Sequence, residues 1–394
     1  MAETVLIGFA EAVAAPETVF SLTRAGYDVR AFCRTGSGRA LHGLPVGDLL
    51  PITAPEHSIE QAIADLRRVV GELGSQCRVL ALDDVALWLV DAAFGHGEIS
   101  VISATGDQAA FALDKTRQLA AARAAGLATP ETVIAGSLDE VRQVNRFPAI
   151  VKPSLAIAVE NGRLVKQPVR YLMDATDRAA LPATAYGFPA LVQPLIVGVG
   201  EGVFGFATAG GVVQWSGHRR VRMMNPHGSG ASACTSNPPD ETTKRRVAAV
   251  LGSIGWRGPF MVEFLRGGDG TLWFMEVNGR LWGSLALARR AGFEYPAWAV
   301  AQAADPTFVP TRDPAASGPT TVRHLGRDLL HLLHVLRGPR TAFHRAGWPR
   351  FWPTLGAVLR PGRRAGFYNY DPRWPDFFLR DAVAVVRQAL RNRQ

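Results

Sequence analysis

The sequence is poor in cysteine and lacks a long apolar run. Only three cysteines occur in 394 residues, Cys33, Cys77 and Cys234. They are widely spaced and match no metal-binding pattern, which argues against a disulfide scaffold and favours a reducing, cytoplasmic location. No run of about 18 uncharged apolar residues occurs, so we expect no membrane-spanning helix. The start, MAETVLIGFAEAV, has no basic region, so we expect no signal peptide.

Charge is distributed unevenly. The net charge is +9, yet residues 320–394 hold 14 arginines, no lysine, four aspartates and no glutamate, a balance of +10. The rest of the chain is therefore near −1. We expect residues 311–394 to form a basic, mainly helical C-terminal extension that packs on a neutral body. Peripheral contact of this extension with an anionic membrane or an acidic partner remains an alternative. No aromatic residues interleave the basic strand segment near residue 220, so we expect no nucleic-acid partner.

Residues 1–106 alternate between strand-like and helix-like segments. The strand-like runs are Thr4–Phe9, Asp28–Cys33, Arg78–Leu82 and Ile99–Ser103, and the helical patterns are Glu17–Ala25, Ser58–Leu73 and Val85–Phe94. This rhythm predicts an α/β domain with a parallel sheet and helices on both faces. The first strand ends in Gly8-Phe9-Ala10 and not in G-x-G-x-x-G, which argues against a dinucleotide site. We interpret Asp83-Asp84 as a helix N-cap with its first-turn acid, and substrate contact as the alternative.

The most informative stretch is Gly258–Ser284, GPFMVEFLRGGDGTLWFMEVNGRLWGS. Its glycine-rich turn predicts a β-hairpin with a loop of two or four residues. Either loop pairs Phe274 with Glu263 and places Glu276 diagonally across from Glu263. Strand alternation then puts both glutamates and Asn278 on one face.

Two carboxylates and an amide in an otherwise apolar hairpin are costly unless a cation neutralises them. Mg²⁺, which prefers oxygen ligands and retains substrate phosphates, fits this role. Arg280 follows as a partner for phosphate oxygens. The spacing E-x12-E-x-N-x-R resembles the metal-binding hairpin of the ATP-grasp superfamily, in which the two acids and the Asn hold Mg²⁺ on ATP. Solvated acids on a surface hairpin are the alternative.

The same resemblance implies two phosphate-binding lysines. The pattern Asp107–Ala125 predicts one long helix that carries Lys115, and the string DK-x10-G-x3-P-x-T resembles the entry to the family's nucleotide domain. Lys152 ends an apolar strand in the context P-x-x-V-K-P, where a buried ammonium needs an anionic partner. The following loop, Ser154–Gln167, departs from the family's glycine-rich pattern, and its Asn161-Gly162 predicts a hairpin.

Further contacts with the nucleotide are carried over from the family onto the segment after residue 190. By resemblance Gln193, Leu195 and Ile196 line the adenine slot, and Glu201 is the candidate for the ribose hydroxyls. If the basic strand HRRVR continues regularly, Arg220 and Arg222 share one face. The family places an arginine here near the reacting phosphate, and we prefer Arg222 for this role, followed by Arg220.

The resemblance covers about Val5 to Val300. It implies a Rossmann-like pre-ATP-grasp domain (residues 1–106) followed by a two-lobed ATP-grasp domain (residues 107–310), with a small lobe at about 127–195 and a large lobe at about 196–310. The pattern N-x-R-x-W-G-S…A-x-x-A-G-x-x-Y-P resembles a branch of predicted carboxylate–amine ligases, related in fold to D-alanine–D-alanine ligase, carbamoyl-phosphate synthetase and biotin carboxylase.

The implied activity is ATP- and Mg²⁺-dependent joining of a carboxylate to an amine through an acyl phosphate, with Mn²⁺ as a substitute for Mg²⁺. Arg280, Arg222 and Arg220 would stabilise the reacting groups. Two alternatives remain, a nucleotide-binding regulator without catalysis and a biotin-carboxylase-like carboxylase. The sequence does not identify the two substrates, and a homo-oligomer stays open.

Overall fold

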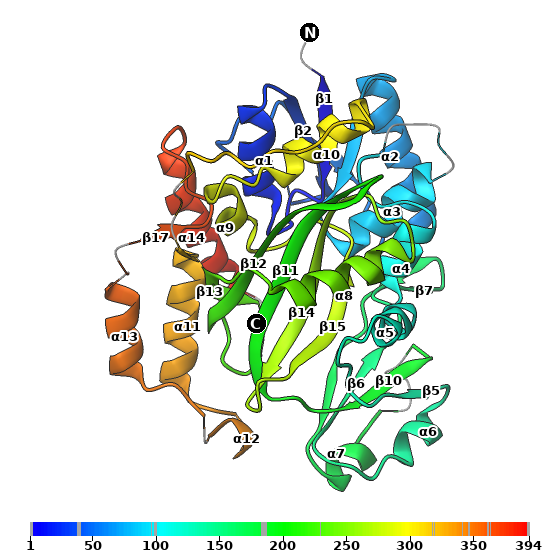
Figure 1. Ribbon diagram of the computed structural model, residues 1–394, viewed down its shortest axis with the longest axis vertical. Helices are drawn as coiled ribbons and strands as arrows, with labels where there is room; N and C mark the ends of the chain where they lie inside the picture. Colours follow the sequence, from blue (N-terminus) through cyan, green and yellow to red (C-terminus); the bar gives the residue numbers. More distant parts are fainter. Residues whose placement is uncertain are drawn as a thin grey trace.

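The computed structural model describes residues 3–37, 41–95, 97, 101–182, 187–228, 230–316, 318, 320–340, 342–345, 347–360, 362 and 364–391. Within these ranges the strands form a four-stranded parallel sheet, a four-stranded antiparallel sheet, a seven-stranded sheet and a separate hairpin (Figure 1). No helix among the described residues combines the length and apolar character needed to cross a membrane.

The N-terminal domain has the predicted parallel sheet. Its elements are β1 (Thr4–Gly8), α1 (Ala15–Arg24), β2 (Asp28–Arg34), β3 (Leu49–Ile52), α2 (Ile59–Leu73), β4 (Arg78–Ala81) and α3 (Asp84–Phe94). The strand order is β3-β2-β1-β4, and all pairs are parallel. The predicted strand Ile99–Ser103 falls partly outside the described residues. Its residue Val101 forms an isolated parallel bridge with Val79 of β4. Strand β3 was not predicted; its Pro51 is tolerated because β3 lies at the sheet edge.

The two faces of this sheet contribute to different cores. Along β1, Leu6 packs with α2 and α3. Val5 and Ile7 pack with α1 and with two helices that come much later in the chain, α9 (Leu285–Arg290) and α10 (Tyr295–Ala304). The alternation follows from the two-residue period of a strand. The N-terminal sheet is therefore packed against later parts of the chain on one of its faces.

A small lobe follows the N-terminal domain. Its elements are β5 (Val133–Ala135), α6 (Leu138–Arg142), β6 (Ala149–Pro153), β9 (Arg170–Leu172), α7 (Ala175–Ala179) and β10 (Ala190–Pro194). The strand order is β5-β10-β6-β9. The predicted hairpin at Asn161-Gly162 is confirmed as β7 (Ala158–Glu160) and β8 (Arg163–Val165). Its turn contacts the N-terminal domain, because the Ile59 amide donates to the Gly162 carbonyl at 2.9 Å.

The large sheet runs in the order β15-β14-β11-β12-β13-β16-β17. Its strands and the helix between them are β11 (Gly198–Thr208), β12 (Gly211–Met223), β13 (Ala231–Ser236), α8 (Glu241–Gly252), β14 (Gly258–Gly267), β15 (Leu272–Asn278), β16 (Thr321–Arg323) and β17 (Ala365–Phe367). All neighbours are antiparallel except β16 and β17.

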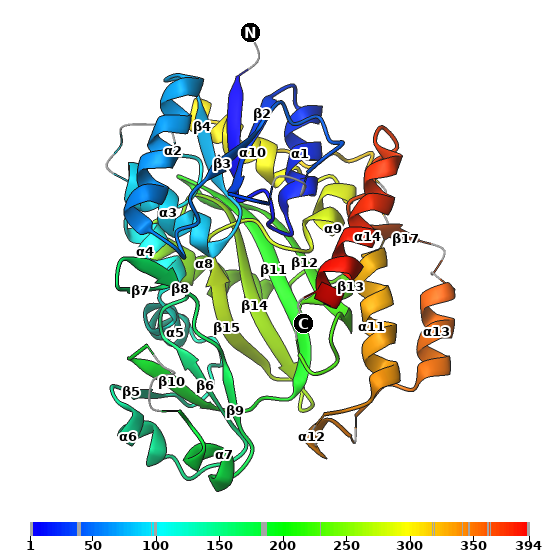
Figure 2. The same ribbon diagram turned by 180° about the vertical axis from the view of Figure 1, so that it is seen from behind.

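The C-terminal extension is mainly helical, as predicted, and it also contributes β16 and β17 to this sheet. Its helices are α11 (Leu325–Arg337), α12 (Ala342–Arg345), α13 (Phe351–Leu359) and α14 (Pro375–Arg391). Helix α11 packs against α13 and α14 (Figure 2). The basic residues therefore belong to a segment that is built into the body.

The single helix predicted over Asp107–Ala125 is wrong. The structure has two helices, α4 (Asp107–Leu113) and α5 (Lys115–Ala124). Asp114 between them adopts an extended conformation, and its carboxylate accepts hydrogen bonds from the Thr116 and Arg117 amides. A side chain that caps the next helix competes with continuation of the previous one. Lys115 consequently begins a helix and does not lie in the middle of one.

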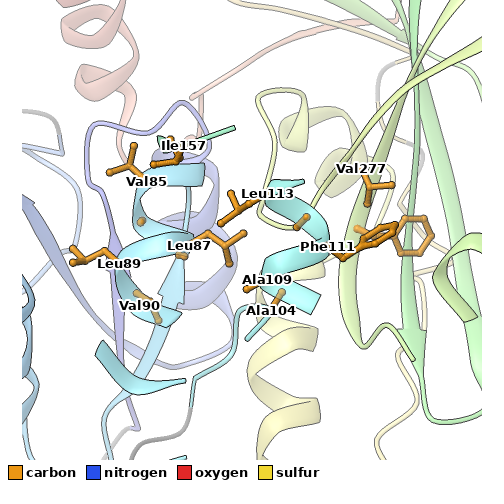
Figure 3. Packing of buried hydrophobic residues seen from close by; sticks show 14 of the residues in the cluster. Val85, Leu87, Leu89, Val90, Ala104, Ala109, Phe111, Leu113, Ile157 and Val277 are labelled. Carbon is orange, nitrogen blue, oxygen red and sulfur yellow. The ribbon is translucent and has the colours of Figure 1, made fainter. Parts of the chain in front are cut away.

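Helix α4 links the N-terminal domain to the large sheet. Figure 3 shows side chains of α3 and α4 turned toward one another, with Phe111 of α4 extending toward Val277 of β15. All of these residues belong to one continuous apolar cluster. The edge of the large sheet is thereby fixed relative to the first domain.

Candidate active site

The hairpin of β14 and β15 brings two carboxylates together. Glu263 lies directly opposite Glu276, Val262 opposite Val277, and Met261 opposite Asn278. Directly paired residues share a face and successive residues alternate. Glu263, Glu276 and Asn278 therefore lie on one face of the large sheet, which we call the site face.

The predicted register of this hairpin is wrong, although the predicted face is confirmed. Arg266 pairs with Leu272, because the loop has three residues and is closed by a hydrogen bond from the Gly267 amide to the Thr271 carbonyl. Gly270 has a φ of +83° in this loop, which suits glycine. A β-bulge between the Glu263 and Phe264 pairs then shifts the register again. The two shifts place the glutamates directly across from each other.

The facing carboxylates of the site face are only partly compensated by cationic side chains of the chain. Burial raises the pKa of the Glu263 carboxyl above its ordinary value; Arg220 opposes this shift and Glu276 adds to it. Arg220 forms an ion pair with Glu263. Two carboxylates on directly opposed positions repel, so a cation between them would stabilise both.

Two lysines face these acids from separate elements. The Lys115 Nζ lies 3.8 Å from the Glu276 Oε2. Burial lowers the pKa of the Lys152 ammonium from 10.5 to about 8, and Lys115 adds to that shift while Glu276 and Glu263 oppose it. Lys152 is only 7% exposed, so its charge needs an anionic partner. Both predicted phosphate lysines are thus brought to the predicted acids.

The position of Lys115 depends on Gln118, which the sequence did not single out. The Gln118 side-chain amide donates to the Val277 carbonyl at 3.0 Å and accepts from the Val277 amide at 2.9 Å. The same Nε2 also donates to the carbonyls of Phe111 and Ala112. Because Val277 follows Glu276, this side chain fixes α5, and with it Lys115, against the acidic strand. A glutamine in a helix gives no sequence signal for such a role.

Arg280 joins the site to the N-terminal domain. Its Nε lies 3.1 Å from the Asp84 Oδ1. Burial acts to lower the pKa of the Arg280 guanidinium, but Asp84 and Glu276 outweigh it and raise that pKa. Asp83 caps α3 as predicted, its carboxylate accepting from the Ala86 amide at 2.7 Å. Asp84 has the further role of holding Arg280.

Two glycines make room for Arg220 and His218 on the site face. A Cβ on Gly200 would lie 2.5 Å from the Arg220 Cδ, and one on Gly202 would lie 3.1 Å from the His218 Cε1. Gly202 pairs with both His218 and Glu263. The Arg220 side chain therefore runs over the glycine strand β11 to reach Glu263.

The expectation that Arg222 shares the face of Arg220 is wrong. A bulge at Val221 pairs Arg220 with Cys234 and Arg222 with the preceding Ala233, so the two arginines lie on opposite faces. Arg222 forms an ion pair with Asp328 of α11, which is fully buried. Arg323 contacts the same carboxylate at 3.2 Å. Only Arg220 of the two lies on the site face.

The expectation for Glu201 also needs correction. Glu201 pairs with Arg219 and Phe264, which alternate with the site-face residues, so it lies on the opposite face. Arg266 contacts both of its carboxylate oxygens, at 2.9 and 2.8 Å. The side chain of Glu201 is 5% exposed. The Glu201 carboxylate is therefore buried, paired with Arg266, and directed away from Glu263, Glu276 and the lysines that face them.

The residues predicted for the adenine slot lie where the small lobe meets the large sheet. Gln193 is buried, and its Nε2 donates to the Thr132 Oγ1 at 2.8 Å. Along β10 it lies on the same face as Leu191, which pairs with Lys152. Leu195 and Ile196 are half-buried in the link from β10 to β11. A ligand held by Lys152 would therefore extend along this face of β10.

The donor set suits Mg²⁺ brought by a phosphate ligand. No three His, Cys, Asp or Glu side chains in the described part of the chain converge on one point. Glu263 and Glu276 supply carboxylate oxygens and Asn278 an amide oxygen, which leaves further positions for phosphate and water. The facing carboxylates make the site favourable for a cation, and Lys115 and Lys152 make it favourable for an anion. Together they fit a metal–phosphate ligand.

The fold resembles several solved enzymes. An L-amino acid ligase from Bacillus licheniformis superposes with a TM-score of 0.59 and 16% identity, covering 77% of this chain and 74% of the ligase. A biotin carboxylase from Campylobacter jejuni gives 0.60 and 16%, covering 79% and 72%. N5-carboxyaminoimidazole synthetase from Staphylococcus aureus, complexed with ADP, gives 0.57 and 11%, covering 79% of each. No protein-family model and no curated protein sequence matches the chain.

Proposed function

The chain has the ATP-grasp fold, and from that premise we propose that it is an ATP- and Mg²⁺-dependent ligase that joins a carboxylate to an amine. The observation that carries this proposal is the pair of opposed carboxylates, Glu263 and Glu276, faced by Lys115 and the buried Lys152. Such an arrangement binds a nucleoside triphosphate together with its metal ion more tightly than it binds the triphosphate or the metal ion alone.

The residues of the site face and those that face it from other elements each have a proposed task. Glu263, Glu276 and Asn278 hold Mg²⁺, which neutralises charge on the phosphate oxygens. Lys115 and Lys152 hold the phosphates. Arg220 and Arg280 stabilise the negative charge that develops between the γ-phosphoryl group and the carboxylate. Gln193, Leu195 and Ile196 line the adenine slot. Arg222 and Glu201 have no place in this arrangement, because both lie on the opposite face.

The reaction needs no nucleophilic side chain. A carboxylate oxygen of the first substrate attacks the γ-phosphorus of ATP, the bond to the β,γ-bridging oxygen breaks, and ADP leaves. The nitrogen of the amine then attacks the acyl carbon, phosphate departs with the electron pair, and the nitrogen loses a proton. The contribution of the chain is to position both substrates and to exclude water while the acyl phosphate exists.

The test is Mg²⁺-dependent ADP formation with paired panels of carboxylates and amines, using wild type, Glu276→Gln and Glu201→Gln. We expect ADP formation only when a carboxylate and an amine are both present, loss in Glu276→Gln, and retention in Glu201→Gln. Glu201 is the matched control, because it is a glutamate on strand β11 of the same sheet but on its other face.

Three results would contradict the proposal in different ways. ATP binding without turnover across the panels would favour a nucleotide-binding regulator. ADP formation with bicarbonate that needs no amine would favour a carboxylase. Absence of ATP binding by the folded protein would remove the nucleotide site itself.

A further inference from the structure

Helix α13 presents an apolar surface to solvent at the edge of the molecule. Its sequence, FWPTLGAVL, contains no charged residue. Trp352 is 75% exposed and Leu359 is 69% exposed, and Pro353 and Ala357 are exposed as well. In both views of the molecule α13 lies on the outer side of α11, away from the other domains (Figures 1 and 2). A large exposed tryptophan on an uncharged helix face is unusual for a surface that meets only water.

The inner side of α13 is fixed to the body. Val358 is buried, and its carbonyl accepts a hydrogen bond from Arg323 of β16. Just before the helix, the Trp348 Nε1 donates to the Val335 carbonyl of α11 at 3.2 Å. The exposed face is therefore held in a fixed orientation by contacts on its other side.

Exposed arginines precede and follow α13 in the sequence, and Arg350 and Arg360 lie directly at its two ends. Between Leu329 and Tyr370 the sequence has seven arginines and no lysine, aspartate or glutamate. The described ones are all exposed, and within the described residues no carboxylate forms an ion pair with them. They are Arg337, Arg340, Arg345, Arg350, Arg360 and Arg364. The apolar face of α13 thus has an exposed arginine at each end, neither in an ion pair with a described carboxylate.

We propose that α13 and the arginines around it dock the protein peripherally on an anionic lipid surface, with Trp352 and Leu359 inserted among the acyl chains and headgroups. Tryptophan favours the membrane interface, apolar side chains gain by burial in it, and arginines gain by contact with anionic headgroups. A second copy of this chain fits less well, because a two-fold interface would place the arginine-rich segments of both copies against each other. A nucleic acid would use the charge but leave the apolar face exposed. This inference does not depend on the proposed ligase activity.

The experiment is flotation of the full-length protein with vesicles of phosphatidylcholine alone or of phosphatidylcholine containing phosphatidylglycerol. We expect binding to the anionic vesicles only, weakened by salt. The double variant Trp352→Ser/Leu359→Ser should weaken binding by about tenfold or more, since the inserted apolar area is lost. Arg350→Glu/Arg360→Glu should weaken it by at least about twentyfold, at roughly fivefold for each arginine lost from the surface.

Matched controls lie elsewhere on the surface. Val309 is 63% exposed, and Arg146 has an 84% exposed side chain on the small lobe. Val309→Ser and Arg146→Glu should leave binding unchanged, and thermal unfolding should show that every variant is folded. The proposal is overturned if wild type does not float with anionic vesicles at low salt, or if both α13 variants float as wild type does. It is also overturned if the face instead mediates concentration-dependent dimers or binds only an acidic peptide or nucleic acid.

Discussion

The two faces of the large sheet treat buried carboxylates differently. On the opposite face, Glu201 is held by Arg266 and approached by Arg219 at 3.8 Å, and Asp328 is held by Arg222 and Arg323. On the site face, Glu263 lies across from a second carboxylate, Glu276. Each acid of the opposite face contacts two arginines, whereas the facing acids of the site face have one cationic partner each, Arg220 for Glu263 and Lys115 at 3.8 Å for Glu276, and repel each other. A carboxylate that is fully paired with arginines stabilises the fold, and a carboxylate whose charge is only partly neutralised is available to bind a ligand.

The largest expected effect comes from removing one carboxylate of the facing pair Glu263 and Glu276. Glu276→Gln should reduce Mg²⁺-dependent ADP formation by about 100- to 1,000-fold, the range seen when one electrostatic contact to a transition state is removed. The melting temperature should be unchanged or slightly higher, because repulsion with Glu263 is relieved. Steady-state kinetics and thermal unfolding of the same preparation measure both quantities. Wild-type activity in this variant would show that the carboxylate pair does not hold the metal.

The converse is expected on the opposite face. Glu201→Gln should lower the free energy of unfolding by about 1–3 kcal/mol, because it leaves Arg266 without its bidentate partner; the value is discounted because that arginine is one-third exposed. ADP formation should stay near the wild-type rate. Denaturant unfolding of Glu201→Gln beside Glu276→Gln provides the comparison. A stability equal to wild type would mean that the clasp contributes little to the fold.

A pH dependence distinguishes the buried Lys152, which faces the acids from the small lobe, from an ordinary lysine. Since the pKa of Lys152 is lowered to about 8, its positive charge is present below that pH and is lost as pH rises through it. Affinity for ADP should fall by about tenfold above pH 8 in wild type, the loss of one charge-assisted contact to phosphate. Lys152→Arg should retain affinity to a higher pH. Calorimetric titration across the pH range tests this, and an equal decline in both proteins would exclude Lys152 as the cause.

The same shift has a consequence for stability. Between pH 8 and 10.5 the unfolded chain binds a proton at Lys152 that the folded chain does not, so this group makes the free energy of unfolding rise with pH over that window. Lys152→Met should remove this contribution. If the free energy of unfolding of the wild type, measured against pH, shows no such rise between pH 8 and 10.5, the burial of the Lys152 ammonium is contradicted.

The smallest expected effect concerns the position of the Arg220 side chain beside Gly200. Gly200→Ala introduces a Cβ that would lie 2.5 Å from the Arg220 Cδ, so the arginine must move away from Glu263. We expect ADP formation to fall by about three- to tenfold with a small change in melting temperature. Gly268→Ala is the control, because a Cβ there meets nothing within 4 Å. Equal rates in both variants would show that the placement of Arg220 is not critical.

The sequence predicted the elements and the face of the acids but not the details that depend on irregular backbone. Alternation placed Glu263, Glu276 and Asn278 together, because a strand has a fixed period. The same rule failed at Arg222, since a bulge at Val221 has no signature in HRRVR. The helix break at Asp114 was missed because an aspartate within an alanine-rich pattern is compatible with continuation.

Contacts made through tertiary structure were also beyond the sequence. Asp328 lies about a hundred residues from Arg222, and nothing in its own helix distinguishes it from a surface acid. The family resemblance points to Glu201 as a ribose contact, whereas its arginine partners come from β12 and β14. Residues that define a local spacing were predictable, and residues whose partners come from distant elements were not.

The amide of Gln118 has a consequence for assembly. Strand β15 is the last strand of the large sheet, and its backbone groups at Val277 would otherwise be open to another strand. The Gln118 side chain occupies the N–H and the carbonyl of that residue as a neighbouring strand would. An edge blocked in this way cannot recruit a second molecule by strand addition at this point. The glutamine that aligns Lys115 therefore also closes this edge of the sheet at Val277.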